Sequence, residues 1–371
     1  MDTESTAAVD APQWLDPDWR EQVLGWVGDR LAEQGRDVTG EVEQPHIYPW
    51  STVFRVPTAE GPVWFKANGR GTAYEVPLLD ALTSWCPDRV LVPLAHDSDR
   101  GWLLLPDGGT TLRAAQSGHT DLAHWEQVLV EYAEMQRLLA PRAEEMVALG
   151  VPDLRPARLP AHLADLLADE DALLLDKPDA LSAAQLAGLR AEQGRFADWC
   201  DQLAATGVAA SLQHDDLHDG NVFMPYGGVG PYRVFDWGDA SVAHPFTTLL
   251  VTLRVVAYRL ELAGGAAELL RLRDAYLEPW TGEHDRATLV EAVRLALLTG
   301  PVGRALSWRR SLLDATPSAR DRHGKGSPAG WPSSANRRRW TRLAERPSWV
   351  SDGPDRPALG VRRPSRSRAP A

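Results

Sequence analysis

The sequence predicts an α+β protein of two lobes: a small N-terminal lobe built on an antiparallel sheet, and a larger, mainly helical C-terminal lobe. Short apolar runs typical of strands are concentrated before position 106. After Thr111, apolar residues recur at helical spacing in long segments. With 371 residues, of which 44% are hydrophobic, the chain is longer than one typical domain and can bury a substantial core.

The N-terminal lobe is predicted over residues 12–106, after a disordered N-terminus at 1–11. Its first element is a helix at 14–34, and a shorter amphipathic helix is predicted at 73–82. Four strands are expected, near 45–56, 62–68, 89–95 and 101–106. Together these elements form a small sheet with helical cover.

The C-terminal lobe is predicted over residues 112–315. Its helices are expected at 122–149, 159–175, 181–203, 245–262 and 289–313. Two short strands, near 221–224 and 232–235, interrupt the helices. Both strands have polar residues at their ends, and these residues carry the functional prediction.

The strongest functional signal is the loop His214-Asp215-Asp216-Leu217-His218-Asp219-Gly220-Asn221, with Asp236-Trp237 following an apolar strand. Phosphoryl transfer needs a carboxylate that accepts a hydroxyl proton, and oxygen ligands that hold Mg²⁺ against the phosphates. Kinases arrange these groups as an aspartate, an asparagine soon after it, and an aspartate ending a nearby strand. The pattern therefore predicts Asp216 as the catalytic base and Asn221 and Asp236 as Mg²⁺ ligands.

The loop resembles that of the aminoglycoside phosphotransferase and choline-kinase-like family of small-molecule kinases, which usually reads His-Gly-Asp-Leu-His-x-Gly-Asn and precedes an Asp-Trp or Asp-Phe pair. Here Asp215 replaces the glycine and places an extra carboxylate beside the base. The resemblance, over roughly residues 12 to 313, implies a protein-kinase-like fold. It implies transfer of the γ-phosphoryl group of ATP or GTP to a small-molecule hydroxyl. It also implies that His214 and His218 brace the loop, and that residues 107–111 form a hinge whose backbone hydrogen-bonds the purine.

A kinase also needs a strand lysine that holds the nucleotide phosphates and an acidic helix residue that orients this lysine. The chain has three lysines against thirty-six arginines, and Lys66 lies within an apolar strand. Glu75 follows nine residues later, in the predicted short helix. The two are predicted as the phosphate-binding lysine and its partner; a surface lysine and a surface glutamate are the alternatives.

The loop that covers the phosphates in protein kinases is rich in glycine, because its backbone N–H groups must approach the phosphates closely. This chain has Pro49-Trp50-Ser51-Thr52 instead. Ser51 or Thr52 is predicted to donate hydrogen bonds to a phosphate. A plain hairpin turn is the alternative.

Other interpretations of the motif carry less weight. Clusters of Asp, Asn and Gly also mark ordinary polar turns. A zinc site at His214 and His218 is disfavoured, because the glutamate that follows the first histidine of a zinc protease is missing. A protein kinase is disfavoured because the glycine-rich loop, an arginine before the catalytic aspartate and an Ala-Pro-Glu segment are absent. A non-catalytic nucleotide- or small-molecule-binding protein with a kinase-like fold stays open, and the complete Asp216, Asn221 and Asp236 set argues against it.

The composition favours a cytoplasmic protein, and a monomer or a dimer is expected. No stretch approaches the ~20 apolar residues of a membrane span, and the N-terminus is acidic where a signal peptide would be basic. Cys86 and Cys200 have no metal-type spacing and are expected to be reduced thiols. The net charge of −12 favours a cationic small-molecule acceptor over nucleic acid. No motif identifies that acceptor.

The C-terminal segment 316–371 differs in kind from the rest of the chain. It holds thirteen basic and four acidic residues and has no sustained apolar period. This composition predicts a disordered basic tail. An abrupt switch to an Arg-, Pro- and Ser-rich chain is also what a shifted reading frame would produce, and sequencing the locus distinguishes the two.

Overall fold

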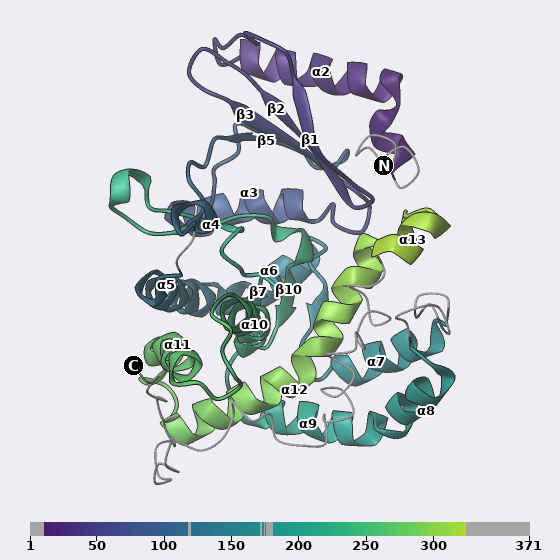
Figure 1. The fold of residues 1–371 in the computed structure, drawn as a ribbon, viewed down its shortest axis with the longest axis vertical. Helices are drawn as coiled ribbons and strands as arrows, with labels where there is room; N and C mark the ends of the chain where they lie inside the picture. The colour runs from purple at the N-terminus through teal and green to yellow at the C-terminus, as the bar shows by residue number, and fades with distance from the viewer. Residues whose placement is uncertain (1–10, 118–119, 171–172, 174, 176–180, 324–371) are drawn as a thin grey trace, which may run out of the picture.

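The computed structural model describes residues 11–117, 120–170, 173, 175 and 181–323. It has two lobes stacked along the long axis of the molecule (Figure 1). A sheet with a long helix across it forms the N-terminal lobe, and helices make up most of the C-terminal lobe. Within the described part of the chain, no helix combines the length and the apolar character needed to cross a bilayer. Both cysteines are buried and free of disulfide bonds.

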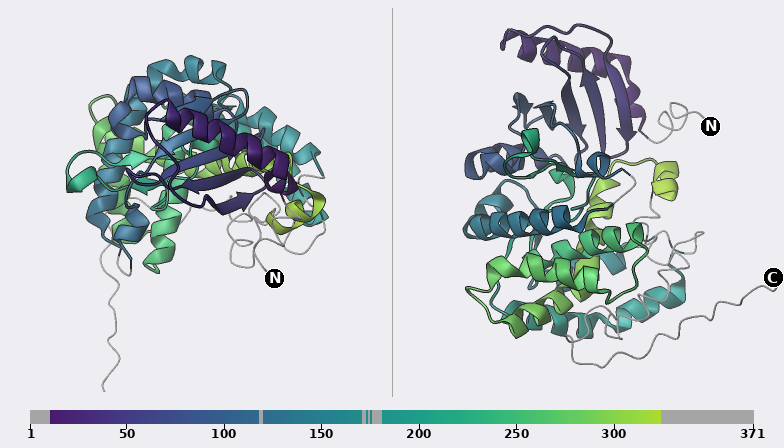
Figure 2. Two further views of the ribbon diagram at one scale, coloured as in Figure 1. Left: turned by 90° about the horizontal axis from the view of Figure 1, so that it is seen from above. Right: turned by 60° about the vertical axis from the view of Figure 1, so that its left-hand side comes forward.

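The N-terminal sheet has five strands in the order β1-β2-β3-β5-β4, and all its neighbouring strands are antiparallel. The strands are β1 (Glu43–Tyr48), β2 (Ser51–Val56), β3 (Val63–Asn68), β4 (Ala95–Asp97) and β5 (Trp102–Pro106). One face buries Phe54, Phe65 and Trp102 against α2 (Pro17–Ala32), which lies across the strands when seen from above (Figure 2). Because side chains alternate along a strand, Lys66 projects from the opposite face.

Local sequence sets the start of the long N-terminal helix. A short 3₁₀ helix, η1 (Pro12–Leu15), leads to Asp16, whose carboxylate accepts hydrogen bonds from the backbone N–H groups of Asp18 (2.8 Å) and Trp19 (3.3 Å). Pro17 occupies the first helical position, where no N–H donor is needed. The predicted helix at 14–34 is thus η1 followed by α2. The helix predicted at 73–82 is α3 (Glu75–Trp85).

Two of the strand predictions need correction. The strand predicted at 45–56 is two strands, because the chain turns at Pro49 and Trp50 between β1 and β2. The strand predicted at 89–95 is wrong: Pro87–Arg89 form a short helix, η2, and β4 begins only at Ala95. Pro87 and Pro93 lack the N–H donors that a paired strand needs.

The C-terminal lobe is built from helices of very different lengths. Its α-helices are α4 (Leu112–Ala115), α5 (Leu122–Leu139), α6 (Ala143–Ala148), α7 (Leu159–Ala168), α8 (Ala183–Ala191), α9 (Gln193–Ala205), α10 (Leu249–Arg259), α11 (Ala267–Leu277), α12 (Arg286–Ser311) and α13 (Pro317–His323). Its 3₁₀ helices are η3 (Ala140–Arg142), η4 (Tyr226–Gly228), η5 (Trp237–Asp239), η6 (Pro245–Thr248) and η7 (Glu278–Trp280). The large core of this lobe is formed mainly by α5, α10, α11 and α12.

Several predicted helices of this lobe are shorter than expected. The helix predicted at 122–149 is interrupted at Pro141, which cannot continue the hydrogen-bond ladder of α5. The one predicted at 181–203 divides into α8 and α9 at Glu192. The prediction of disorder from residue 316 onward is wrong for Pro317–His323, which form the helix α13. The predicted disorder at 1–11 is likewise wrong for Ala11, which is buried in the core of the N-terminal lobe. Residues 1–10 and 324–371 lie outside the described residues.

Short strands hold the functional loop. β7 (Ser211–Gln213) pairs with β10 (Ser241–Ala243), which pairs with β6 (Asp153–Leu154). β8 (Val222–Phe223) pairs with β9 (Arg233–Val234), close to the predicted strands at 221–224 and 232–235. The motif loop therefore connects β7 to β8. Asp236 lies two positions after the end of β9, so the two strand pairs bring the two parts of the motif together.

The turn between β1 and β2 contacts the C-terminal helices. The ring of Trp50 stacks on Tyr48 with centroids 5.0 Å apart, and meets Trp308 of α12 edge-on at 5.6 Å. Arg70 and Asp314 form an ion pair between the lobes at 2.8 Å. Figure 1 shows α12 running diagonally through the C-terminal lobe, with α13 reaching up to this corner of the sheet. The turn is thus held against the C-terminal lobe by an aromatic contact, and the Arg70–Asp314 ion pair joins the two lobes as well.

Gly71 lies against the backbone of the C-terminal lobe at Arg310, and its replacement tests this contact. A Cβ atom at Gly71 would overlap the backbone carbonyl of Arg310. Gly71→Ala is expected to lower the unfolding free energy by about 1–3 kcal/mol, because backbone has to move. Urea unfolding measures this change. Gly25→Ala is the control: it lies on α2 with open space around it and should gain up to about 1 kcal/mol. Equal stability of Gly71→Ala and the wild type would contradict the close approach.

Candidate active site

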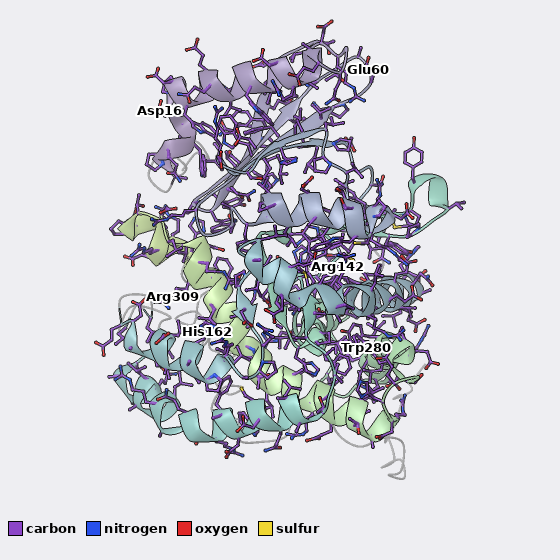
Figure 3. The ribbon with its side chains drawn as sticks, turned by 180° about the vertical axis from the view of Figure 1, so that it is seen from behind. Asp16, Glu60, Arg142, His162, Trp280 and Arg309 are labelled. Carbon is purple, nitrogen blue, oxygen red and sulfur yellow. The ribbon has the colours of Figure 1, made fainter. Side chains whose placement is uncertain are left out.

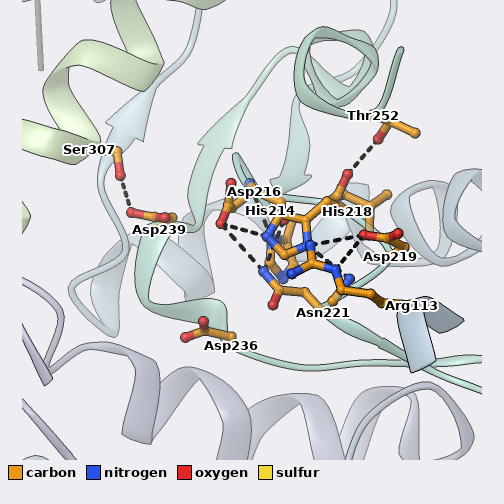
Figure 4. A network of polar contacts seen from close by, with 12 residues as sticks. Arg113, His214, Asp216, His218, Asp219, Asn221, Asp236, Asp239, Thr252 and Ser307 are labelled. Atoms are coloured by element: carbon orange, nitrogen blue, oxygen red, sulfur yellow. Dashed lines mark hydrogen bonds and ion pairs between the residues drawn. The ribbon is translucent and has the colours of Figure 1, made fainter. Parts of the chain in front are cut away.

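The carboxylate of Asp216 belongs to the polar network shown in Figure 4. Its Oδ1 accepts a hydrogen bond from Arg304 Nη2 at 2.9 Å, and its Oδ2 lies 3.4 Å from His218 Nε2 and from Asn221 Nδ2. Burial opposes ionisation, but Arg304 and His218 outweigh it and hold the pKa of Asp216 below its ordinary value. The side chain is 22% exposed, so a charged carboxylate is presented at a partly open position.

The two histidines of the motif brace the loop from inside. His214 is buried; its Nε2 donates to the carbonyl of Phe235 (2.9 Å), and its Nδ1 accepts from the backbone N–H of Asp216 (3.3 Å). Burial lowers the pKa of His214, which favours the neutral ring that these bonds require. His218 Nδ1 accepts from the backbone N–H of Gly220 at 3.0 Å, which leaves the Nε2 hydrogen directed at Asp216. Both histidines thus form hydrogen bonds with the backbone in and beside the loop.

Asp215, which stands where the family that the loop resembles usually has glycine, adopts a backbone conformation that favours glycine. Its φ is +62°, in the left-handed region that glycine enters freely and that aspartate tolerates better than most residues. Its Oδ2 accepts from the Ser241 hydroxyl at 2.8 Å. Burial raises the pKa of Asp215 to about 6, against the opposing effects of Ser241 and Arg304. The extra carboxylate therefore turns inward, away from the role of a second base.

The raised pKa of Asp215 predicts that the unfolding free energy of the protein falls as the pH rises. The folded-state pKa of Asp215, about 6, exceeds its ordinary value of 3.8, so the stability contributed by the protonated acid is lost as pH rises through 6. Asp215→Asn keeps the shape and cannot ionise. From pH 4.5 to 7.5, the unfolding free energy of wild type should therefore fall by about 2 kcal/mol relative to Asp215→Asn. Urea unfolding at both pH values measures the difference, and a constant difference would contradict the buried acid.

Lys66 joins the two lobes through a pair of carboxylates. Its Nζ lies 2.5 Å from Glu75 Oε2 on α3 and 2.6 Å from Asp236 Oδ1. Burial favours the neutral amine, yet Asp236 and Glu75 raise the pKa of Lys66 above its ordinary value. Glu75 is itself buried and accepts from the backbone N–H of Trp237 at 3.0 Å. The structure thus brings the predicted lysine, its partner and a predicted metal ligand together, from segments 170 residues apart.

Asn221 and Asp236 present oxygen atoms that suit Mg²⁺. Asn221 donates from Nδ2 to the carbonyl of Asp216 at 3.0 Å, and its Oδ1 has no donor among the described residues. The Asp236 side chain is 49% exposed, with Oδ1 on Lys66. Within the described ranges no group of three His, Cys, Asp or Glu side chains forms a metal site. One carboxylate and one amide oxygen fit an ion that takes its other ligands from phosphates and water.

The structure separates the two residues of the predicted phosphate-covering turn. Ser51 begins β2 on the same face as Val53, which pairs with Lys66. Thr52 lies on the opposite face and is fully buried; its hydroxyl donates to the His46 carbonyl (2.7 Å) and accepts from Gln44 (2.9 Å). The prediction for the Thr52 side chain is therefore corrected, because alternation along the strand turns it into the core. Ser51 keeps its place as a candidate.

The segment predicted as the hinge packs on the β8–β9 pair. The Gly108 carbonyl accepts from Arg233 Nη2 at 2.9 Å, and Met224 donates its backbone N–H to the Thr110 carbonyl at 2.9 Å. A Cβ at Gly108 would overlap the ring of Phe223, so only glycine fits. Phe223 in turn stacks on Phe235, with centroids 4.3 Å apart. The segment thus lies beside two stacked aromatic rings at the ends of β8 and β9.

Sequence reasoning missed several charged residues around the loop. Asp219 is buried and pairs with Arg113 of α4 and Arg259 of α10, each at 2.9 Å. Arg304 of α12 contacts Asp216 and Asp239. Arginines are frequent in this chain and none of these three lies in a motif, so no local signal identifies them. Asp239 lies three positions after Asp236, close to the motif, and this proximity is the one signal in the sequence that could have identified it.

Comparisons with known proteins show a family and structures to which this chain is similar. A family model described as the phosphotransferase enzyme family matches residues 52–289. A macrolide 2′-phosphotransferase type I has a similar structure, with 16% identity, a TM-score of 0.54, and coverage of 82% of this chain and 97% of that one. An ethanolamine kinase from Plasmodium vivax matches with 13% identity, a TM-score of 0.53, and coverage of 81% and 84%.

A third solved structure, choline kinase LicA from Streptococcus pneumoniae, matches with 13% identity, a TM-score of 0.50, and coverage of 82% of this chain and 98% of that one. None of the curated proteins matches the sequence. These likenesses confirm the predicted α+β, bilobal, protein-kinase-like fold.

Proposed function

The chain belongs to the phosphotransferase enzyme family, and we propose that it moves the γ-phosphoryl group of ATP or GTP to a hydroxyl of a small molecule. The observation that carries this proposal is the position of Lys66, which bonds to both Glu75 and Asp236. Asp216 and Asn221 lie on the loop beside them and contact each other. A lysine, a carboxylate base and two oxygen ligands are the groups that phosphoryl transfer uses.

In this mechanism Lys66, oriented by Glu75, holds the α and β phosphates through its positive charge. Ser51 donates a hydrogen bond to the same phosphates, and residues 107–111 present backbone groups to the purine beside the stacked rings of Phe223 and Phe235. Asn221 and Asp236 would hold Mg²⁺, which when bound neutralises charge on the phosphates.

Asp216 receives the acceptor. Its ionised carboxylate accepts the hydrogen of the acceptor hydroxyl, and so points the oxygen at the γ phosphorus. Because neighbouring groups hold its pKa below the ordinary value, Asp216 is a weak proton acceptor at neutral pH. We infer that it mainly orients the hydroxyl and takes the proton late, as a loose phosphoryl-transfer transition state allows.

We propose a cationic acceptor, such as an amino alcohol or an antibiotic amino sugar. The net charge of −12 steers such molecules toward the protein. Structural relatives include enzymes named for a macrolide, for ethanolamine and for choline, which supports a hydroxylated small molecule. We also propose the lobe boundaries 12–106 and 112–315, with the hinge at 107–111 between them, and a cytoplasmic location.

The test is nucleotide consumption with Mg²⁺ across a panel of hydroxylated amines, aminoglycosides, macrolides and sugars. Acceptor-dependent turnover in the wild type, with a product phosphorylated on oxygen, is the expected result. A Mg²⁺-dependent thermal shift with ATP or GTP, measured in parallel, reports nucleotide binding. Binding without turnover on any acceptor would favour the alternative of a non-catalytic nucleotide- or small-molecule-binding protein.

A further inference from the structure

One arginine outside the motifs connects the predicted base to a second aspartate. Arg304 donates from Nη2 to Asp216 Oδ1 and from Nη1 to Asp239 Oδ2, each at 2.9 Å. Ser307, one turn further along α12, donates its hydroxyl to the other oxygen of Asp239. The guanidinium carbon also lies 5.7 Å from the ring centroid of Trp308. The Arg304 side chain is 19% exposed, and its guanidinium group contacts two carboxylates and an indole ring.

The helix that carries Arg304 gives it a fixed frame. The segment of α12 around it is almost entirely buried, including Val302, Ala305 and Leu306 on either side. The helix packs against α7, α9 and α10, so it cannot shift without disturbing the core. Arg304 therefore links a position set by the C-terminal core to a loop that His214, His218 and Asp219 also hold.

The two oxygens of Asp216 are held unequally. Oδ1 makes the close bond to Arg304, whereas Oδ2 has two contacts of 3.4 Å, to His218 and Asn221. Hydrogen bonds weaken with distance, so Oδ2 is the oxygen with spare accepting capacity. Because the carboxylate group is rigid, the bond from Arg304 to Oδ1 also fixes the direction in which Oδ2 points.

We propose that Arg304 is a positioning residue for phosphoryl transfer, which holds Oδ1 of Asp216 so that Oδ2 meets the acceptor hydroxyl. Asp239 and Ser307 serve to hold Arg304. This inference rests on the proposed function and adds a residue to it. The planar fork of a guanidinium bonds two carboxylates at once, which an ammonium group cannot match in geometry.

The test compares Arg304→Gln, Arg304→Lys and Arg304→Ala with the wild type, in kcat and in KM for nucleotide and acceptor. Misplacing a reacting group by about 1 Å costs on the order of 100-fold, so Arg304→Gln should lose about that factor in kcat. Its nucleotide KM should stay within about 3-fold, because Lys66 and Asp236 are untouched. Arg304→Lys should recover part of the loss, and millimolar guanidinium should restore turnover in Arg304→Ala.

Arg309→Gln is the matched control, on the same helix but paired with Asp169 at 2.5 Å instead of with the loop. Seen from behind (Figure 3), Arg309 lies where α12 passes α7. This control should keep the wild-type kcat, which separates loss of an α12 ion pair from loss of the contact with Asp216.

Several results would overturn the inference. Wild-type kcat in Arg304→Gln removes the positioning role and leaves the proposed function standing. Equal losses in Arg304→Lys and Arg304→Gln, with no recovery of Arg304→Ala by guanidinium, would assign Arg304 to stability alone. A wild-type protein that turns over no acceptor removes the proposed function, and this role with it.

Discussion

Asp216→Ala is expected to reduce turnover by about 10²–10⁴-fold, the range that a positioned proton acceptor contributes. The variant removes the carboxylate that is proposed to orient the acceptor hydroxyl. Lys66, Glu75 and Asp236 are unchanged, so affinity for the Mg-nucleotide should survive. Steady-state kinetics with the acceptor found in the panel measures the loss, and calorimetric titration with nucleotide measures the affinity.

The control for this prediction is Asp165→Ala, an exposed aspartate on α7, which should keep full turnover. Melting temperatures of both variants show whether either one is unfolded. Near-normal turnover in a folded Asp216→Ala protein would remove this residue from its role, and the search for the base would move to another carboxylate.

Asp236→Ala is expected to weaken both nucleotide binding and turnover. It removes one of the two proposed Mg²⁺ ligands and one of the two carboxylates on Lys66, which stays paired with Glu75. Even residues that only support a metal ligand cost roughly 10–100-fold in metal affinity when replaced, so loss of a ligand should cost at least that. Nucleotide titrations with and without Mg²⁺ measure the effect.

Asp314→Ala serves as the control for Asp236→Ala. Asp314 also forms an ion pair between the lobes, with Arg70, but it does not touch Lys66. In the Asp314→Ala protein, Mg²⁺ should therefore strengthen nucleotide binding as much as it does in the wild type. An Asp236→Ala protein in which Mg²⁺ strengthens nucleotide binding as much as in the wild type would exclude Asp236 as a metal ligand.

The candidate loop could be located in the sequence because its motif is local. Asp216 and Asn221 are five positions apart and contact each other directly. Lys66 could be found because a lysine inside an apolar strand is unusual. The bends in the chain were harder to place: the turn at Pro49 and the break at Pro141 each interrupt a continuous apolar pattern, and periodicity alone does not show where a strand or helix stops.

By itself, the sequence determined the α+β class, the identity of the loop residues and the pairing of Lys66 with Glu75, since each of these depends on neighbours along the chain. The tertiary structure alone decided that Thr52 faces the core while Ser51 faces Lys66, because strand register sets which face a side chain joins. It alone placed Arg304 on Asp216, 88 residues away. A contact across that distance depends on how α12 packs in the core, and no local pattern encodes it.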